Sequence, residues 1–241
     1  SSSLRRALDI LDYIAQDDRD SAGVSLTQLA LGLGTTKSTV LRLLAPLIEY
    51  GLVSRTDAGL YQIGLQAVHL GQRYLERSDL ISIAAESLAR LVETTGETAH
   101  LVIPVGHEVV YVAKAAGSSK SAMSSRVGSR QPMYSTAVGK AILAHSSPQV
   151  VELVVNAGMP RLTPSTITSR AALLRELSAV RQNGYAVDDV ENELGIRCVG
   201  AVVLDAESGP AGAISISGPD GRVTRERVAS IGDHVREVAL T

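Results

Sequence analysis

The segment LTQLALGLGTTKSTVLRLL, residues 26–44, has the pattern of two short helices joined by a tight turn. Ala30 stands where two such helices approach most closely, so only a small side chain fits there. Gly34 follows four residues later, where the turn requires a left-handed backbone conformation that glycine adopts without strain. The apolar contacts between the helices are expected from Leu29, Val40 and Leu43. The segment therefore predicts a helix-turn-helix.

Further helices and a hairpin are expected around this segment. Apolar side chains recur at helical spacing in residues 4–14, which predicts an amphipathic helix before it. Ser25 is expected to cap the second helix, and the third helix is expected to end at Tyr50. Two β-prone segments follow, residues 52–55 and 60–63, with the turn sequence TDAG between them. A helix, a helix-turn-helix and a hairpin in this order describe a winged helix.

The start of the third helix is expected to contact DNA. Residues 35–48 contain a Lys and an Arg but no acid, and hydroxyl and basic side chains can reach base edges and phosphates from the major groove. An alternative is a three-helix domain that uses the same geometry only for packing or protein contact. The predicted DNA-binding residues, including one in the wing, are Thr35, Thr36, Lys37, Ser38, Thr39, Arg42 and Arg55.

The rest of the chain has the pattern of a larger α+β domain. Residues 65–92 have a helical pattern with a polar break near residues 77–79, where we place the domain boundary. Neighbouring strands joined by short turns predict an antiparallel sheet flanked by helices. The expected strands are residues 98–104, 108–115, 121–127, 185–188, 199–204 and 211–217, and the expected helices are 137–145, 148–156, 170–183 and 224–239. The predicted domains are therefore a winged helix-turn-helix over 1–64, a linker helix over 65–78 and a second domain over 79–241.

Composition limits the classes of function. The 241 residues carry a formal net charge of −2, so DNA binding has no global basic signal and depends on local charge. No apolar run approaches the ~18 residues of a membrane span, and the single cysteine fits a reducing compartment, so we expect a soluble cytoplasmic protein without membrane contact. The five His residues lack metal-ligand spacing, and no cofactor motif is present, so neither a metal nor a cofactor is expected.

Residues 134–140, YSTAVGK, form a hydroxyl-rich turn that opens a predicted helix. The free N–H groups and the dipole at a helix start favour an anion such as a carboxylate. The segment is not a P-loop, because Tyr134 stands where that motif needs Gly and Ala141 where it needs Ser or Thr. The plainer alternative is that Ser135 or Thr136 only caps the helix.

With these residues considered, the chain resembles the IclR family of bacterial transcription regulators over nearly its whole length. Many ordered matches are more specific than any one motif. The matching segments are residues 4–11 (LRRALDIL), 36–44 (TKSTVLRLL), 59–64 (GLYQIG), 97–101 (ETAHL), 108–112 (EVVYV), 125–130 (SRVGSR), 139–141 (GKA), 184–193 (GYAVDDVENE), 195–199 (GIRCV) and 215–219 (SISGP).

The resemblance implies a GAF-like effector-binding domain, a double-stranded DNA operator, and homodimers or homotetramers. It implies a small organic acid or aromatic ligand whose carboxylate is held by backbone amides of Ala137 and Val138. The other residues that it places around the ligand are Met123, Gln131, Asp188, Ile196, Cys198, Ser215 and Ser217. The chain departs from the family at Gln131, Tyr134 and Val138, which favours a ligand larger or more polar than the simplest keto acids.

The sequence thus predicts an effector-responsive, sequence-specific DNA-binding transcription regulator that is not an enzyme. Two alternatives are a cysteine-dependent hydrolase that uses Cys198 and a protein-interaction module in which the winged helix docks a partner. A lone cysteine is more often a small buried apolar residue than a nucleophile. The sequence does not distinguish repressor from activator or dimer from tetramer, and it identifies neither the effector nor the operator.

Overall fold

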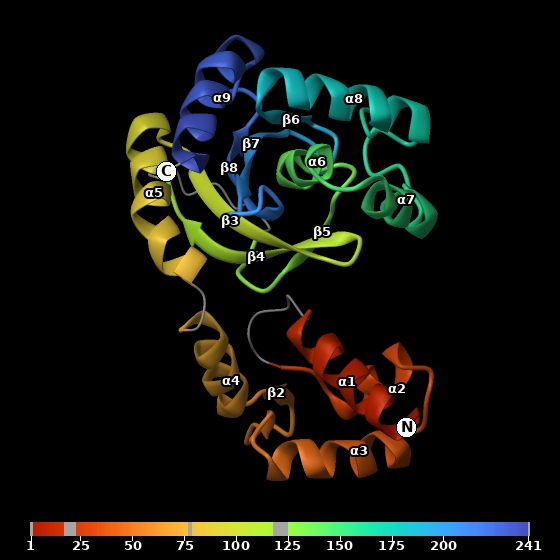
Figure 1. Cartoon of the computed structure of the whole chain (residues 1–241). Helices are drawn as coiled ribbons and strands as arrows, with labels where there is room; N and C mark the ends of the chain where they lie inside the picture. Colours follow the sequence, from red (N-terminus) through yellow and green to blue (C-terminus); the bar gives the residue numbers. More distant parts are fainter. Residues whose placement is uncertain (1, 17–22, 77–78, 118–124, 241) are drawn as a thin grey trace. The chain divides into compact units, whose positions relative to one another are not determined.

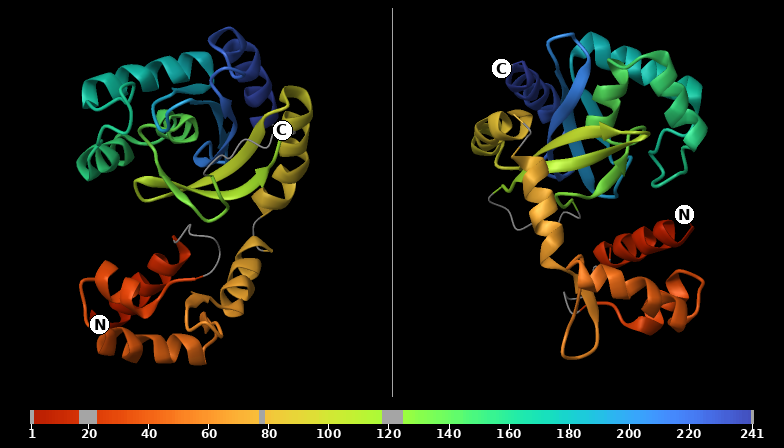
Figure 2. Two further views of the ribbon diagram at one scale, coloured as in Figure 1. Left: turned by 180° about the vertical axis from the view of Figure 1, so that it is seen from behind. Right: turned by 60° about the horizontal axis from the view of Figure 1, so that its bottom comes forward.

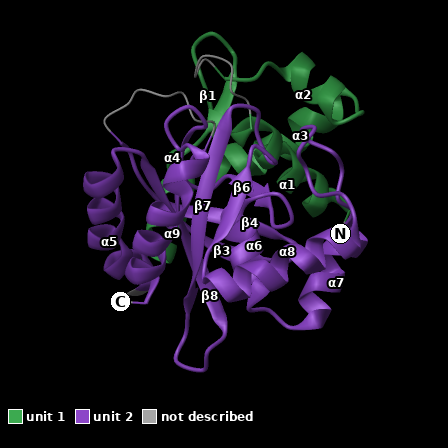
Figure 3. Cartoon of the chain, turned by 90° about the horizontal axis from the view of Figure 1, so that it is seen from above, with its two compact units in different colours: residues 1–79 green, residues 80–241 purple. Residues whose placement is uncertain are grey.

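The computed structural model describes residues 2–16, 23–76, 79–117 and 125–240. The chain divides into two compact units, residues 1–79 and residues 80–241, which are coloured separately in Figure 3. Each unit has its own hydrophobic core. None of the described helices is both long and apolar enough to cross a membrane.

The first unit begins with the predicted helix-turn-helix. Helices α1 (Ser2–Ala15), α2 (Leu26–Gly32) and α3 (Lys37–Glu49) pack together. The Ser25 hydroxyl accepts a hydrogen bond from the Gln28 amide at 3.3 Å, and the Gln28 carbonyl oxygen accepts one from the Ser25 amide at 2.8 Å, so both ends of this cap are satisfied. Gly34 has φ +58°, which confirms the left-handed turn expected there.

The wing follows as a two-stranded antiparallel hairpin, β1 (Val53–Arg55) and β2 (Tyr61–Ile63), and Val24 bridges to Tyr61 beside it. Buried aliphatic side chains from α1, α2 and α3 meet the inner face of the hairpin, which closes the core of the unit. These side chains include Ile10, Leu29, Val40, Leu44 and Val53. Helix α4 (Leu65–Leu75) completes the unit. The winged helix is therefore confirmed.

The second unit is built on a six-stranded antiparallel sheet in the order β5-β4-β3-β8-β7-β6 (Figure 1). Every pairing in it is antiparallel, as the short turns of the sequence predict. The strands are β3 (Thr98–Val105), β4 (Glu108–Ala115), β5 (Arg130–Pro132), β6 (Ala186–Asp189), β7 (Ile196–Leu204) and β8 (Pro210–Pro219).

Helices cover both faces of this sheet, as the two views of Figure 2 show. The helices on one face are α6 (Ala137–Ala144), α7 (Pro148–Ala157) and α8 (Arg170–Asn183). The other face carries α5 (Asp79–Thr95) and α9 (Arg225–Ala239). The alternation along β7 separates the two cores, because Val199 and Ala201 face α5 and α9 whereas Val202 packs on the α6 side. The α+β architecture is confirmed.

One expected strand is wrong. Residues 125–127 form no strand, and the remainder of the expected 121–127 segment lies outside the described residues. The edge strand is instead β5, with the sequence Arg130-Gln131-Pro132. This sequence has no apolar alternation, and it ends in a proline, which has no backbone N–H to donate to a neighbouring strand. A strand of three residues at a sheet edge leaves almost no pattern in a sequence.

Candidate functional site

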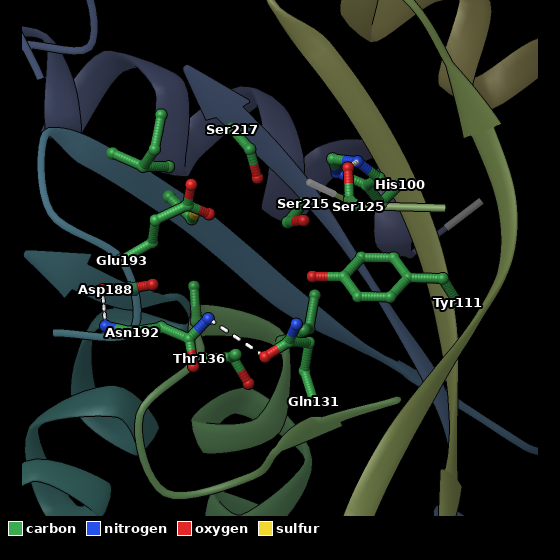
Figure 4. A pocket seen from close by; sticks show the side chains of 14 residues that line it. His100, Tyr111, Ser125, Gln131, Thr136, Asp188, Asn192, Glu193, Ser215 and Ser217 are labelled. Carbon is green, nitrogen blue, oxygen red and sulfur yellow. Dashed lines mark hydrogen bonds between the residues drawn. The ribbon is translucent and has the colours of Figure 1, made fainter. Parts of the chain in front are cut away.

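A small cavity lies on the α6 face of the second unit, with a volume of about 30 Å³ (Figure 4). Strands β3, β4, β7 and β8 provide its floor, and the start of α6 and the loop after β6 provide its walls. The lining residues are His100, Tyr111, Ser125, Gln131, Thr136, Ala137, Val138, Asp188, Asn192, Glu193, Ile196, Cys198, Ser215 and Ser217. No Lys or Arg is among the described residues that line it.

The floor of the cavity is set by strand register. Ser215 pairs with His100 on β3 and with Gly200 on β7. Two residues further along the same face, Ser217 pairs with Cys198, and Cys198 with Asp188 on β6. Because residues two apart on a strand point to the same face, these polar groups gather on one side of the sheet.

Two backbone N–H groups at the start of α6 are available to a ligand. The Thr136 hydroxyl caps the helix by accepting from the Gly139 amide at 3.2 Å, and it donates to the Pro132 carbonyl at 2.7 Å. The amides of Ala137 and Val138 have no acceptor among the residues that the structure describes. Unsatisfied amides at a helix start carry a partial positive charge, so they attract an anion.

Gly200 permits the close approach of α6 to the sheet. A Cβ atom at this position would lie 3.1 Å from the Ile214 carbonyl oxygen and 3.2 Å from the Val138 nitrogen. Both neighbours are backbone atoms, so neither can rotate away. The absence of a side chain at Gly200 therefore fixes the height of the two free amides above the floor of the cavity.

Asp188 is buried in the wall of the cavity, with 2% of its surface exposed. Its Oδ1 atom accepts hydrogen bonds from the amides of Glu191 at 2.7 Å and Asn192 at 3.2 Å. Burial raises the pKa of this carboxyl group from 3.8 to about 7, against the opposing effect of those two bonds and of the positive charge on Lys140. Asp188 therefore titrates in the physiological range.

The aromatic wall of the cavity is uncharged near neutral pH. Burial, assisted by the nearby charge of Lys114, lowers the pKa of His100 to about 3, and burial raises that of the Tyr111 hydroxyl. The two rings meet edge to face with centroids 5.0 Å apart. His100 Nε2 lies 2.8 Å from the Ser125 hydroxyl, and its buried Nδ1 has no partner among the described atoms.

Cys198 is held as a thiol. Burial and the negative charge of Asp188 raise its pKa well above the usual value, so thiolate is scarce at neutral pH. A nucleophilic cysteine requires the opposite shift. The described residues also include no group of three His, Cys, Asp or Glu side chains arranged to hold a metal ion.

A buried ion-pair cluster lies behind the cavity. Lys140 on α6 is fully buried, and its Nζ contacts Glu191 Oε1 at 2.5 Å and Glu176 Oε1 at 3.0 Å. The hydroxyls of Thr163 and Thr166 donate to the Glu191 carbonyl at 3.2 and 2.7 Å. These contacts tie the loop after β6, which carries Asn192, to α6, so this wall of the cavity and the free amides are held together.

A polar link joins the two sides of the cavity above α6. Asn192 Nδ2 donates to Gln131 Oε1 at 3.2 Å, and the Ser135 hydroxyl donates to Asn192 Oδ1 at 2.9 Å. Figure 4 shows the first of these bonds. Gln131 lies on the edge strand β5, and Asn192 lies in the loop after β6.

The structure brings together all the predicted effector residues that it describes, and Met123 lies outside the described residues. Sequence reasoning missed His100, Tyr111, Ser125, Thr136, Asn192 and Glu193 as lining residues. His100 had a usable signal, since a histidine inside an apolar strand pattern stands out. Asn192 and Glu193 had none, because their loop is held by the contact of the neighbouring Glu191 with Lys140.

The predicted DNA-binding face lies at the start of α3. Lys37, Ser38 and Arg42 are exposed. Thr36 is the N-cap rather than a helical residue, and its hydroxyl accepts from the Thr39 amide at 3.3 Å and lies 3.0 Å from the hydroxyls of Ser38 and Thr39. Thr35 is half-buried in the turn before it. In the wing, the guanidinium of Arg55 lies 5.9 Å from the centre of the Tyr61 ring.

A winged helix-turn-helix joined to a sheet domain with an anion-attracting cavity defines the class of ligand-responsive transcription regulators. Comparison with known families identifies the particular family. The model for the C-terminal domain of the bacterial transcriptional regulator IclR matches residues 72–241, and the model for the IclR helix-turn-helix domain matches residues 3–57. The chain belongs to the IclR family.

Individual relatives agree with this assignment. The transcriptional repressor IclR of Escherichia coli K12 is 34% identical over 241 residues, which cover 98% of this chain and 87% of that protein. The IclR crystal structure from Thermotoga maritima superposes with a TM-score of 0.78 at 34% identity, over 99% of this chain and 96% of that one. An IclR homolog from Microbacterium hydrocarbonoxydans, crystallised with 4-hydroxybenzoate, shares the fold with a TM-score of 0.81 at 21% identity, over 98% and 95% of the two chains.

Proposed function

We propose that a small carboxylate binds in the cavity of the second unit and changes the affinity of the first unit for its DNA operator. The single observation that carries this proposal is the pair of free amides of Ala137 and Val138, which open onto a cavity with buried hydroxyls and no Lys or Arg among its described residues. Such a site suits a compact anion that accepts several hydrogen bonds. The hydroxyls of Ser215 and Ser217 and the Cys198 thiol are the proposed partners of its other polar atoms.

The size of the cavity favours a ligand of few atoms. A volume of about 30 Å³ is small, so a short oxo or hydroxy acid fits the site with the least rearrangement, whereas the departures from the family sequence favour a larger or more polar ligand. A larger aromatic acid requires the link between Gln131 and Asn192 to open and Tyr111 to move. Gln131 of β5 and Ile196 at the start of β7, which both line the cavity, are therefore the proposed determinants of ligand size.

The DNA contacts are assigned to the start of α3. Lys37 and Arg42 are proposed to contact phosphates or guanine edges, with the hydroxyls of Ser38 and Thr39 and the turn residue Thr35 beside them. Thr36 contributes by capping the helix, so its hydroxyl is partly committed. Arg55 is proposed to contact the backbone from the wing.

A homodimer formed through the first unit is proposed to present two recognition helices to a two-fold operator. The support is apolar surface on two helices: Leu8 of α1, and Leu65, Val68 and Tyr74 of α4 are all exposed. A second copy of the chain would cover such surface. Helix α4, the proposed linker over residues 65–78, would then transmit ligand binding as a change in the spacing of recognition helices, with a coupling typically worth ~1–3 kcal/mol. A tetramer requires a further contact through the second unit.

The protein is proposed to act without catalysis and in the cytoplasm, where a bacterial operator lies. The raised pKa of Cys198 argues against the hydrolase alternative. If that alternative held, Cys198→Ala would abolish turnover of an ester or amide, whereas the regulator predicts only altered ligand affinity.

Fluorescence anisotropy of labelled DNA from upstream of the protein's own gene tests the proposal, with unrelated DNA as the control at the same salt concentration. Glyoxylate, pyruvate and 4-hydroxybenzoate are then added in turn. We expect specific binding that one acid weakens or strengthens several-fold. Well-folded protein that binds no DNA would favour the interaction module, and an operator affinity that no acid changes would contradict the effector mechanism.

A further inference from the structure

We propose that Asp188 enters the ligand complex as the neutral acid and donates a hydrogen bond to the bound carboxylate, so that effector binding takes up a proton from solvent. The inference rests on the proposed carboxylate ligand. It assigns to Asp188 the role of hydrogen-bond donor, the opposite of the acceptor role that a carboxylate side chain ordinarily has. The protein would then bind its effector, in net terms, as the uncharged acid.

The charges around the cavity motivate this assignment. The only side chains with an acidic carboxyl among the described lining residues are Asp188 and Glu193, and none of these residues is Lys or Arg. Lys140 is the cation near Asp188, but its ammonium group already contacts two carboxylates, Glu176 and Glu191. An anionic ligand beside an ionised Asp188 would therefore place two like charges together in a poorly solvated site whose described lining residues include no Lys or Arg. Such pairs relieve the repulsion by retaining one proton.

The two backbone hydrogen bonds of Asp188 use one of its carboxyl oxygens, and the neighbouring Cys198 thiol also hydrogen-bonds the carboxyl group. Oδ1 is occupied by the amides of Glu191 and Asn192, which orient the carboxyl group, and Asp188 itself lines the cavity (Figure 4). Oδ2 is not part of that pair of backbone bonds. Because Asp188, Ala137 and Val138 line the same cavity, a proton on Oδ2 is proposed to be donated to the ligand carboxylate that the free amides of α6 hold.

The histidine, tyrosine, cysteine and lysine side chains that face Asp188 keep their charge near neutral pH. His100 of β3 is neutral above its pKa of about 3, while the pKa values of Tyr111 on β4 and Cys198 on β7 are raised above their usual ranges. Lys140 of α6 keeps its charge because its two glutamate partners raise its pKa despite burial. Glu176 on α8 and Glu191 and Glu193 in the loop after β6 are the remaining acids. The pKa of Asp188, about 7, gives it the proton near neutrality.

Calorimetry of the full chain with pyruvate and with 4-hydroxybenzoate, from pH 6 to pH 9 in buffers of different ionisation heat, tests the inference. Because only the protonated form binds, we expect Kd to rise about tenfold for each pH unit above 7, so binding is ~100-fold weaker at pH 9 than at pH 6. Above pH 8, about one proton should be taken up for each ligand bound. A Kd that stays constant across this range would overturn the proposal.

Asp188→Asn is the matched variant, because its amide oxygen can accept the same two backbone bonds while its NH2 group donates permanently. We expect this variant to bind the probe without pH dependence and without proton uptake. Asp188→Ala removes the donor and should bind weakly at every pH. If Asp188→Asn loses affinity at pH 6 as fully as Asp188→Ala does, Asp188 acts as an ionised acceptor and the proposal is wrong.

If neither probe binds, the proposed carboxylate effector is contradicted. A measurement without ligand then tests the protonation of Asp188 by itself. The Asp188 carboxyl is followed by carbon-13 NMR as a function of pH and assigned by its loss in Asp188→Asn. A midpoint near pH 7 supports a protonated Asp188 at the binding step, whereas a midpoint below about pH 5 overturns it.

Discussion

Helices α3 and α6 start with the same local device in two different surroundings. Each is capped by a threonine with an extended backbone, Thr36 at φ −86°, ψ 151° and Thr136 at φ −95°, ψ 147°, and each cap accepts a hydrogen bond from the amide three residues later. The start of α3 is exposed and carries Lys37 and Arg42, whereas every residue of α6 is buried and the cavity beside it lacks basic side chains among the described residues.

This difference shows how burial selects the kind of anion. An exposed helix start suits an extended polyanion, because basic side chains supply most of the attraction and salt screens it. A buried helix start suits one small anion, because two amides in a poorly solvated site provide fixed positive dipoles at no cost in side-chain order. The same backbone geometry thus serves the proposed operator site and the proposed effector site.

Removing the basic side chains of α3 should have the largest effect. We expect Lys37→Ala with Arg42→Ala to weaken operator binding by about 100-fold or more and to reduce its dependence on salt, because phosphate contacts are lost in each copy of the chain. Anisotropy with labelled operator measures this change. Arg175→Ala, an exposed arginine on α8, is the control and should bind as the parent does. If Arg175→Ala lost as much operator affinity as the double variant, the overall charge of the protein and not the start of α3 would determine DNA binding.

Removing a backbone N–H group at the start of α6 should lower the affinity for the effector and leave the affinity for DNA unchanged. Ala137→Pro deletes one free N–H, and proline suits this first helical position because Thr136 is already extended. We expect effector affinity to fall by about tenfold, as for loss of one charge-assisted hydrogen bond. Arg170→Pro, at the first position of α8, is the matched control, and operator binding without effector should be unchanged in both. An unaltered ligand affinity in Ala137→Pro would show that the Ala137 amide does not bind the ligand.

The two caps should differ in their contribution to stability. Thr36→Ala is expected to lower the free energy of unfolding by about 1 kcal/mol, the usual cost of a lost N-cap. Thr136→Ala should cost more, ~2 kcal/mol, because it leaves the half-buried Pro132 carbonyl and the buried Gly139 amide without their partner. Urea unfolding followed by circular dichroism compares the variants. Similar losses would show that water reaches the start of α6.

The affinities of the two sites should depend differently on salt concentration even in the unaltered protein. Between 50 and 300 mM salt we expect operator affinity to fall steeply, since counterions are released from DNA, and effector affinity to change by less than about twofold. Anisotropy and calorimetry at matched salt concentrations measure the two dependences. An effector affinity as sensitive to salt as the operator affinity would indicate that the ligand is held by exposed charges.

The exposed site was the easier one to predict from sequence. The helix-turn-helix is local: Ala30, Gly34 and the cap at Ser25 lie within ten residues, so the chain itself carries the pattern. For the cavity, the family resemblance supplied Asp188, Cys198, Ser215 and Ser217.

The remaining walls of the cavity depend on contacts distant in sequence. Lys140 reaches Glu176 and Glu191 across 36 and 51 residues, and the link of Gln131 to Asn192 spans 61. No local pattern encodes such contacts. The strand expected at residues 121–127 failed for a related reason, because the short β5 is defined by its pairing with β4 rather than by its own side chains.

Gly200 also has a consequence for how this regulator can acquire new ligands. Any larger residue there would press on the backbone of Ile214 and Val138, so mutation at this position disturbs recognition of every acid alike. Gln131 and Ile196 are only partly buried and lie on the walls, where a change of side chain alters the space offered to one ligand relative to another. Laboratory selection for a new effector should therefore accumulate substitutions at Gln131 and Ile196 and leave Gly200 as it is.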